Sequence, residues 1–524
     1  MPANRTSRPS ASRRSSARTP HSSSHVAANS AGRGPATRLE KDSMGEMAVP
    51  ADALYGATTQ RAVINFPISG RPIPIEVIAA FTLLKRACGE VNRDLKKLDS
   101  RRASAITAAC DALLAGLESD GARAFGTVAP VDGWMRHFPI DVFQTGSGTS
   151  TNMNVNEVIA NLAAQAAGKP IGGREPIHPN DHVNMGQSSN DTFPTAMQIA
   201  AVVAIKSSLL PALEVLRKAL ASKAKKWNKV VKVGRTHLMD ATPVRVGQEF
   251  AGFAAQIEYC SRRAERAMVR LAENLPIGGT AVGTGINTHP KFGALVAAKL
   301  SKATGVTFAE AANHFEAQST RDCVVEASGH LKTIAVSLSK IANDIRWLGS
   351  GPRCGLFELS LPATQPGSSI MPGKVNPVIC ESVMMVACQV VGHDAAITLG
   401  GFGGTGSLLQ LNVAMPMMSE NLQNMITLLA NAATMFAEKA IAGLELNETI
   451  ATGFVERSLM MCTSLAPVIG YDAAAKVAKS AFAEGKTVRE YVLEHKLVEP
   501  RKLDALLDPW SMTEPGGEGS GGGG

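Results

Sequence analysis

The chain has 524 residues, of which 45% are hydrophobic and 19% charged, so it is long enough for two or three domains around a large core and is not disordered throughout. Its few aromatic residues, 5% of the chain, beside 20 Met and 48 Gly favour helical cores over many-stranded sandwiches. Seven Arg before residue 40 account for nearly all of the net charge of +8, which argues against nucleic-acid binding by the folded part. No run of about eighteen uncharged apolar residues occurs, which argues against a membrane span.

The two ends differ in composition from the rest of the chain. Residues 1–36 are rich in Ser, Arg, Pro and Ala and predict a disordered extension. The same acid-free composition is typical of organellar transit peptides, but Pro2, Pro9 and Pro20 argue against the amphipathic helix that such peptides form. Eight scattered Cys without a CxxC pair indicate a reducing compartment. We therefore expect a cytoplasmic protein, with an organellar matrix as the alternative.

Between the ends, the sequence predicts three domains. Residues 37–185 have short patterns broken by Gly and Pro and predict an N-terminal domain. Residues 186–444 predict a central helical bundle, and residues 445–513 a small C-terminal helical domain. Residues 514–524 predict a flexible Gly-rich tail.

The central region carries the strongest periodic signal. Apolar residues recur at steps of three and four in three stripes: Val246, Phe250, Phe253, Ile257, Cys260 and Ala264; Leu331, Ile334, Leu338, Ile341, Ile345 and Leu348; Leu209, Leu213, Leu216 and Leu220. Each stripe predicts a long helix with one buried face. Rods of about thirty residues would be about 45 Å long, which favours an elongated bundle.

Four polar segments precede helical patterns in the chain: Ser147-Gly148-Thr149, Ser188-Ser189-Asn190, Thr236-His237 and the segment 367–377. Helix starts expose unpaired N–H groups with partial positive charge, so hydroxyl and amide side chains beside them form anion sites. Simple N-capping is the alternative for any one segment. Four such segments together favour a site for a small anion.

The segment 367–377, GSSIMPGKVNP, departs most from an ordinary cap. Gly367 and Gly373 allow close backbone approach to a ligand, and Lys374 and Asn376 offer a cation and an amide donor. The segment differs from a P-loop in its glycine spacing and in having Val375 where Ser or Thr is required, so phosphate binding is the minor interpretation.

These segments carry a family resemblance that covers roughly residues 38–513. The chain resembles the fumarase/aspartase superfamily of lyases, and within it the class II fumarases. The motifs that carry the resemblance are GSSIMPGKVNP at 367–377, KDSMG from Lys41, VPAD from Val49, QTGSGTSTNMNVNEV from Gln144, HPNDHVN from His178, QSSNDTFPTAM from Gln187, GRTHLMDATP from Gly234 and GGTAVGTGINTHP from Gly278.

The resemblance implies an all-α, three-domain fold with a central bundle of long helices. It implies a hydro-lyase of the tricarboxylic acid cycle that reversibly hydrates fumarate to (S)-malate, without metal or organic cofactor. The substrate is a small dicarboxylate, and the carbanion intermediate places its charge in the neighbouring carboxylate. The family forms homotetramers in which loops of three subunits build each active site. Neither nucleic acid nor membrane is an expected partner.

The resemblance also assigns roles to residues. Ser368 would remove the C3 proton, which requires N–H groups or a cation such as Lys374 to stabilise its oxyanion. His237, paired with Glu381, would move the proton of the departing or entering water. The substrate carboxylates would bind at Ser147, Gly148, Thr149, Ser188, Ser189, Asn190, Thr236, Ser369, Lys374, Val375 and Asn376. A peripheral dicarboxylate site would comprise His178, Pro179, Asn180 and Asp181, with a plain Asx-turn as the equal alternative.

Small differences separate the hydratase from an aspartate ammonia-lyase. Ser188-Ser189-Asn190, Pro372-Gly373-Lys374 and Asn287-Thr288-His289-Pro290 are all typical of fumarases. The chain departs from the family at Met239, at the stretch GFGGTGSLLQLN from Gly401 and at an insertion around Gly121 to Gly133. The ammonia-lyase and a non-catalytic scaffold stay as alternatives. The GxGxxG run at Gly401–Gly406 predicts a loop between bundle helices rather than a dinucleotide site.

Overall fold

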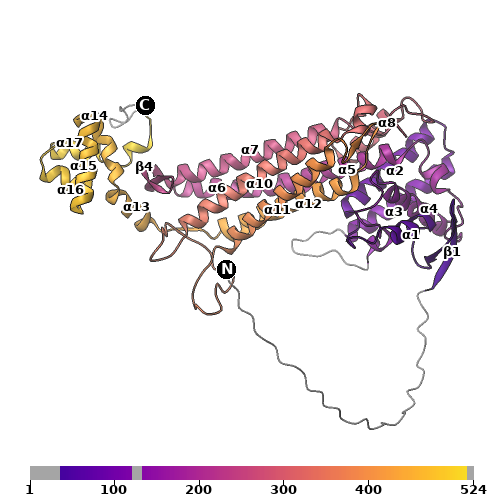
Figure 1. The fold of residues 1–524 in the computed structure, drawn as a ribbon, viewed down its shortest axis with the longest axis horizontal. Coiled ribbons are helices and arrows are strands. Elements are labelled where there is room, and N and C mark those ends of the chain that lie inside the picture. Colours follow the sequence, from indigo (N-terminus) through magenta and orange to yellow (C-terminus); the bar gives the residue numbers. More distant parts are fainter. Residues whose placement is uncertain (1–35, 121–132, 516–524) are drawn as a thin grey trace, which may run out of the picture.

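The computed structural model describes residues 36–120 and 133–515. The predicted N-terminal extension, apart from residue 36, most of the insertion around Gly121 to Gly133 and most of the Gly-rich tail lie outside the described residues. Figure 1 shows an elongated molecule with a helical region at one end, long parallel and antiparallel rods in the middle and a small helical group at the other end. Within the described ranges every named strand belongs to a two-stranded pair, so the predicted all-α class is confirmed.

The first region combines a hairpin with four helices. Strands β1 (Thr37–Asp42) and β2 (Gly45–Pro50) pair antiparallel. The helices are α1 (Ala57–Asn65), α2 (Ile75–Asp94), α3 (Ser100–Asp120) and α4 (Thr149–Ala166). Helix α2 packs on α3 and on α5 (Ser189–Ala204) because its face with Phe81, Leu84 and Cys88 is apolar and fully buried.

Long helices form the bundle in the middle of the molecule. They are α5 (Ser189–Ala204), α6 (Leu210–Lys226), α7 (Val246–Ala272), α10 (Asp322–Leu348), α11 (Val378–Gly401) and α12 (Met415–Phe436), with the shorter α8 (Phe292–Thr304) and α9 (His314–Ser319) between α7 and α10. All residues of the three predicted stripes are buried, which confirms these helices and their buried faces. Each buried Leu, Ile or Phe side chain contributes about 1.5–3 kcal/mol, so the stripes hold the rods side by side.

Two rods are more apolar than the charge pattern of the sequence predicts. Helices α5 and α6 continue through a π-helical turn, Ile205–Leu209, as one rod of 38 residues. By length and composition, this rod and α11 could cross a membrane. Core helices of soluble bundles can be equally long and apolar. In the most apolar window, 56% of the rod is buried but only 33% of α11. Helix α11 therefore presents an apolar face that this chain alone does not cover.

Short strands occupy the connections at the ends of the rods. Strands β3 (Val231–Thr236) and β4 (Met239–Arg245) form a hairpin between α6 and α7. Strand β5 (Leu359–Ser360) pairs with β8 (Glu445–Leu446), and β6 (Ser407–Leu408) pairs with β7 (Leu411–Asn412). The run Gly401–Gly406 starts at the last residue of α11 and leads into β6, so it forms the predicted loop between α11 and α12.

The last region packs around a core of its own. Its helices are α13 (Glu448–Arg457), α14 (Ala466–Ile469), α15 (Tyr471–Glu484), α16 (Val488–Glu494) and α17 (Pro500–Leu506). Leu465, Val492 and Leu503 are fully buried there, and Val233 of β3 joins them. A second core runs without a break from the first region into the bundle. The predicted domain boundary between residues 444 and 445 falls between the two cores. The predicted boundary between residues 185 and 186 lies within one continuous core. Both boundaries stay predictions.

Candidate active site

Two helix N-termini meet at the first two polar segments. Helix α4 begins at Thr149 and α5 at Ser189. The hydroxyl oxygen of Thr149 lies 2.7 Å from that of Ser189 and 2.8 Å from that of Ser147, so three hydroxyl groups form a chain across the two helix starts. Because backbone N–H groups at helix starts carry partial positive charge, this arrangement favours a bound carboxylate. We call these three residues the hydroxyl chain.

Gly148 allows the two helix starts to approach this closely. Its φ is +70°, and a Cβ at this position would lie 1.9 Å from the ring of Phe193 on α5. Any larger residue would push the two helices apart. The glycine of the SGT segment therefore sets the spacing of the hydroxyl chain.

Ser188 and Asn190 fix the start of α5. The Ser188 hydroxyl accepts a hydrogen bond from the Asn190 backbone N–H, and the Ser188 N–H donates to the Asp191 carboxylate, which is a capping box. The Asn190 side-chain amide donates to the Ala281 carbonyl at 2.7 Å. Ser188 thus acts as the N-cap of α5, as the capping alternative predicts. Thr149 and Ser189 instead bond to one another through their hydroxyl groups.

A lysine outside the predicted site lies behind these helix starts. Lys85 on α2 is fully buried, and its ammonium donates to the side-chain oxygens of Asn152 at 2.7 Å, Asn184 at 2.9 Å and Gln187 at 2.9 Å. Burial lowers the pKa of Lys85 to about 8. A sequence signal for it exists, because Lys85 falls on the apolar face of its helix, where a lysine is rare.

Thr236 and His237 occupy a hairpin turn rather than a helix start. Thr236 ends β3, and His237 and Leu238 have φ of +58° and +62° between the two strands. The polar segment was predicted to precede the helix that contains Val246; strand β4 separates them, because β3 and β4 pair and the turn reverses the chain. His237 and Met239 are exposed at the tip.

The segment 367–377 forms an exposed loop ahead of α11. The Ser368 hydroxyl oxygen accepts hydrogen bonds from the backbone N–H groups of Ile370 at 3.3 Å and Met371 at 3.0 Å. The Asn376 amide donates to the Gly367 carbonyl and closes the loop at its base. Two N–H donors directed at one oxygen stabilise negative charge on it, which is the arrangement that a serine base requires.

The loop leaves room beneath it and carries the remaining predicted residues. A cavity of about 910 Å³ separates Met371 to Pro377 from the end of α10 at Arg346 and Trp347. Ser369, Lys374 and Val375 are exposed. Figure 1 shows the loop below the bundle, away from the hydroxyl chain's helices at the other end.

The chain does not bring its predicted catalytic residues into one place. The hydroxyl chain lies at the beginning of the Ser189–Lys226 rod and the His237 hairpin follows its end, and 38 helical residues span about 57 Å. Glu381 is exposed in the first turn of α11. Within the described part of the chain, no hydrogen bond or ion pair joins Glu381 to His237. The residues thus form three separate groups: the hydroxyl chain, the His237 hairpin and the 367–377 loop.

The departure at 401–412 lies beside the first of these groups. The backbone N–H of Met415 donates to the Gly146 carbonyl, and that of Val413 donates to Gly406. A Cβ on Gly146 would lie 1.7 Å from the Val413 carbonyl oxygen. The connection from α11 to α12 therefore packs against the residue that precedes Ser147.

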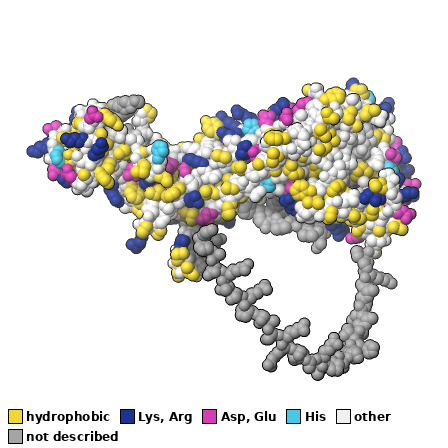
Figure 2. Space-filling view, viewed as in Figure 1, with side chains coloured by type: hydrophobic (Ala, Val, Ile, Leu, Met, Phe, Trp, Pro, Cys, Tyr) yellow, Lys and Arg dark blue, Asp and Glu magenta, His cyan; other side chains and the backbone are white. Residues whose placement is uncertain are grey.

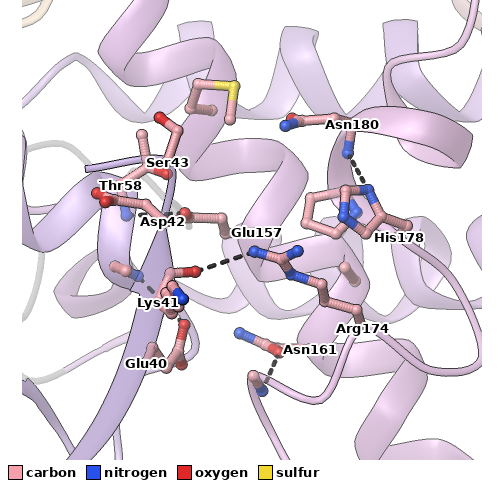
Figure 3. Close-up of a pocket in the computed structure, with 15 residues that line it drawn as sticks. Glu40, Lys41, Asp42, Ser43, Thr58, Glu157, Asn161, Arg174, His178 and Asn180 are labelled. Atoms are coloured by element: carbon pink, nitrogen blue, oxygen red, sulfur yellow. Dashed lines mark hydrogen bonds between the residues drawn. The ribbon is translucent and has the colours of Figure 1, made fainter. Parts of the chain in front are cut away.

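A second pocket adjoins the predicted peripheral site. It has a volume of about 590 Å³ and is lined by β1, α1, α4 and the turn from His178 to Asn180. Figure 3 shows the Arg174 side chain crossing the pocket to the Lys41 carbonyl, to which it donates at 2.9 Å. The pocket thus places two cationic residues and His178 around one cavity.

The acidic residues of this pocket are bonded within the protein. The Arg61 guanidinium lowers the pKa of Asp42 through bonds of 2.8 and 3.0 Å. The buried Glu157 carboxylate accepts the N–H groups that begin α1, and burial raises its pKa. Their charges are therefore directed at protein donors rather than at the cavity.

The turn at His178 is held differently from an Asx-turn. His178 Nδ1 accepts hydrogen bonds from the backbone N–H groups of Asn180 at 3.2 Å and Asp181 at 3.1 Å. A π-helical turn, Pro179–Val183, follows. The cap is thus the imidazole of His178 rather than a side-chain oxygen of Asn180 or Asp181. The peripheral dicarboxylate site and the plain turn both stay predictions.

Comparison with known proteins places the chain in a family. The lyase family matches residues 45–392, and the fumarase C C-terminus family matches residues 461–514. The chain is 53% identical over 482 residues to a fumarate hydratase class II of Corynebacterium efficiens, covering 91% of this chain and 96% of that one. It is 48% identical over 482 residues to the mitochondrial fumarate hydratase of Danio rerio, covering 92% and 91%. The class II fumarase structure of Schistosoma mansoni superposes with a TM-score of 0.86 at 35% identity, covering 92% and 100%. The chain belongs to the lyase family and, within it, to the class II fumarate hydratases.

Proposed function

We propose that the protein reversibly hydrates fumarate to (S)-malate. The observation that carries this proposal is the 53% identity, across 91% of the chain, to a relative named fumarate hydratase class II. The polar groups support it, because they comprise hydroxyl and amide donors for two carboxylates together with one serine whose oxygen accepts two N–H bonds.

The proposed chemistry begins at C3 of malate. Ser368, as an alkoxide stabilised by the N–H groups of Ile370 and Met371, takes the C3 proton, and the electron pair moves into the adjacent carboxylate. The C2–O bond then breaks, and His237 donates the proton with which the hydroxide leaves as water. Lys374 and Asn376 hold the carboxylate that receives the charge, and the hydroxyl chain holds the other.

We propose further that the site is complete only in a homotetramer. One copy would supply the hydroxyl chain, a second the His237 hairpin with Thr236, and a third the 367–377 loop. The separation of these groups within one chain supports this assignment. So does the uncovered face of α11, where Met385 is 65% and Leu399 54% exposed. Figure 2 shows hydrophobic side chains along the visible face of the bundle, between its charged groups.

The pocket at His178 is proposed as a peripheral dicarboxylate site. Lys41 and Arg174 supply its positive charge, while its acids Asp42 and Glu157 are bonded to the protein. Asn180 and Asp181 present backbone N–H groups to the His178 ring, so the imidazole is kept in one orientation.

A cytoplasmic location is proposed with the hydratase function. The organellar matrix is the alternative, since relatives include bacterial enzymes and a mitochondrial one.

The assay that tests the function uses malate and aspartate separately. Purified protein is expected to form fumarate, measured by its ultraviolet absorbance, from malate and not from aspartate. Fumarate from aspartate alone would establish an ammonia-lyase instead. The departures from the family at Met239 and 401–412 would then have changed the substrate preference of the pocket. Fumarate from neither would contradict both activities and favour the scaffold alternative.

A further inference from the structure

A buried cation lies behind the hydroxyl chain. The Lys85 ammonium donates to Asn152, which is one turn into α4, and to Gln187, which directly precedes the Ser188 cap of α5. Its third acceptor is Asn184, whose amide donates in turn to the Gln187 carbonyl at 3.2 Å. One ammonium thus ties together the two helix starts that carry the hydroxyl chain.

Among the described residues, no carboxylate bonds to the Lys85 ammonium. All three acceptors are neutral amides. The groups that interact with it electrostatically are Asp191 of α5, Cys110 of α3 and Cys88 of its own helix. Burial raises the pKa of both thiols, so neither carries a charge at neutral pH. Asp191 accepts the N–H groups of Ser188, Gly278 and Thr280, so its charge is bonded elsewhere.

Stability does not account for a lysine at this position. A buried ammonium loses its hydration, which is why its pKa is lowered, and the folded protein is destabilised by that loss at neutral pH. Well-packed apolar side chains often stabilise such sites as well as charged ones do. A charge placed behind a carboxylate-binding site, by contrast, favours the bound anion.

We propose that Lys85 is a positioning residue of the dicarboxylate site. Its ammonium orients Asn152, Asn184 and Gln187 beneath the hydroxyl chain, and its charge favours the substrate carboxylate bound there. This inference rests on the proposed function, because it assumes that the hydroxyl chain binds one end of a dicarboxylate.

The sharpest test neutralises the charge without removing the lysine. In the Asn184→Asp variant a carboxylate replaces the amide 2.9 Å from the ammonium, so an ion pair holds Lys85 in place and cancels its field. The matched control is Asn92→Asp, since Asn92 lies on the same helix and donates its amide to the Met185 carbonyl. Seven residues separate Asn92 from Lys85, which is about 10 Å along the helix.

Succinate, an unreactive dianion, is the binding probe. In Asn184→Asp, the Kd for succinate is expected to rise about tenfold, and the KM for malate is expected to rise with it. In Asn92→Asp, the Kd is expected to rise less than about threefold. Asn92→Asp places a buried carboxylate against the Met185 carbonyl oxygen, so it is expected to lower the melting temperature at least as much as Asn184→Asp does. A rise in Kd confined to Asn184→Asp is therefore not a consequence of lower stability. Equal Kd values for the two variants would overturn the proposal, and so would an unchanged Kd in Asn184→Asp.

Two substitutions of the lysine complete the test. Lys85→Met removes the ammonium donor from three amide oxygens and is expected to weaken succinate binding at least about tenfold. Lys85→Arg is expected to restore part of the loss. If Arg binds succinate no better than Met, the charge has no role and the proposal is overturned. Should Lys85→Met not fold, the two Asn variants decide alone. An unmodified protein without hydratase activity would instead contradict the proposed function.

Discussion

Replacement of Ser368 by alanine is expected to lower malate dehydration by about a thousandfold or more. The loss follows from the proposed role of Ser368 as the base, because general-base catalysis contributes about 10²–10⁴-fold and no other hydroxyl takes its place between the two N–H donors. Initial rates of fumarate formation measure it. The KM for malate is expected to change little, since the Ser368 hydroxyl is not assigned to a carboxylate.

The fold is expected to survive this substitution. Ser368 lies in an exposed loop, and within the part of the chain that the structure describes its side chain bonds only to backbone groups of that loop. The matched control is Thr364→Ala in the same connection, which is exposed and is expected to retain full activity. A Ser368→Ala enzyme within tenfold of the unmodified rate would exclude Ser368 as the base.

Replacement of His237 by asparagine is expected to lower the rate by about a hundredfold or more, because the departing hydroxide then lacks its proton donor. Asparagine is chosen because it tolerates the left-handed conformation, so the turn with φ of +58° is kept. The rates of both directions, measured with malate and with fumarate, are expected to fall together.

Leu238→Asn supplies the control for the turn. Leu238 is the neighbouring exposed residue, with φ of +62°, and carries no proposed role. Its variant is expected to keep most of the activity. If both variants lose the same activity, the turn rather than the imidazole is responsible.

The sequence allowed the long helices to be predicted because their cores repeat with a helical period. The stripes beginning at Val246 and Leu331 lie on α7 and α10 and are buried throughout. The hairpin at His237 was missed, since a six-residue strand beside a long apolar helix carries too little pattern to distinguish it from a helix start. The exposed apolar face of α11 was not predicted. Charged residues interrupt its apolar sequence, and the sequence does not show that one chain buries only 33% of its most apolar window.

The sequence predicts a set of residues for the candidate site but not their arrangement. The polar segments stand out by composition, and the hydroxyl chain from Ser147 to Ser189 follows from two adjacent helix starts. The N–H groups at Ser368 depend on the loop's backbone, which composition does not determine. Lys85 lies about a hundred residues before Asn184 in the chain, so its role behind the site depends on tertiary packing.

The most direct test of a site shared between copies combines the two inactive variants. Ser368→Ala and His237→Asn chains, co-expressed with different tags, are purified as mixed assemblies that carry both tags. If loop and hairpin come from different copies, about a quarter of the sites in random assemblies receive both intact residues, and up to about a quarter of the unmodified activity is expected. Mixed assemblies no more active than either parent would contradict the account, because each site would then take both residues from one chain.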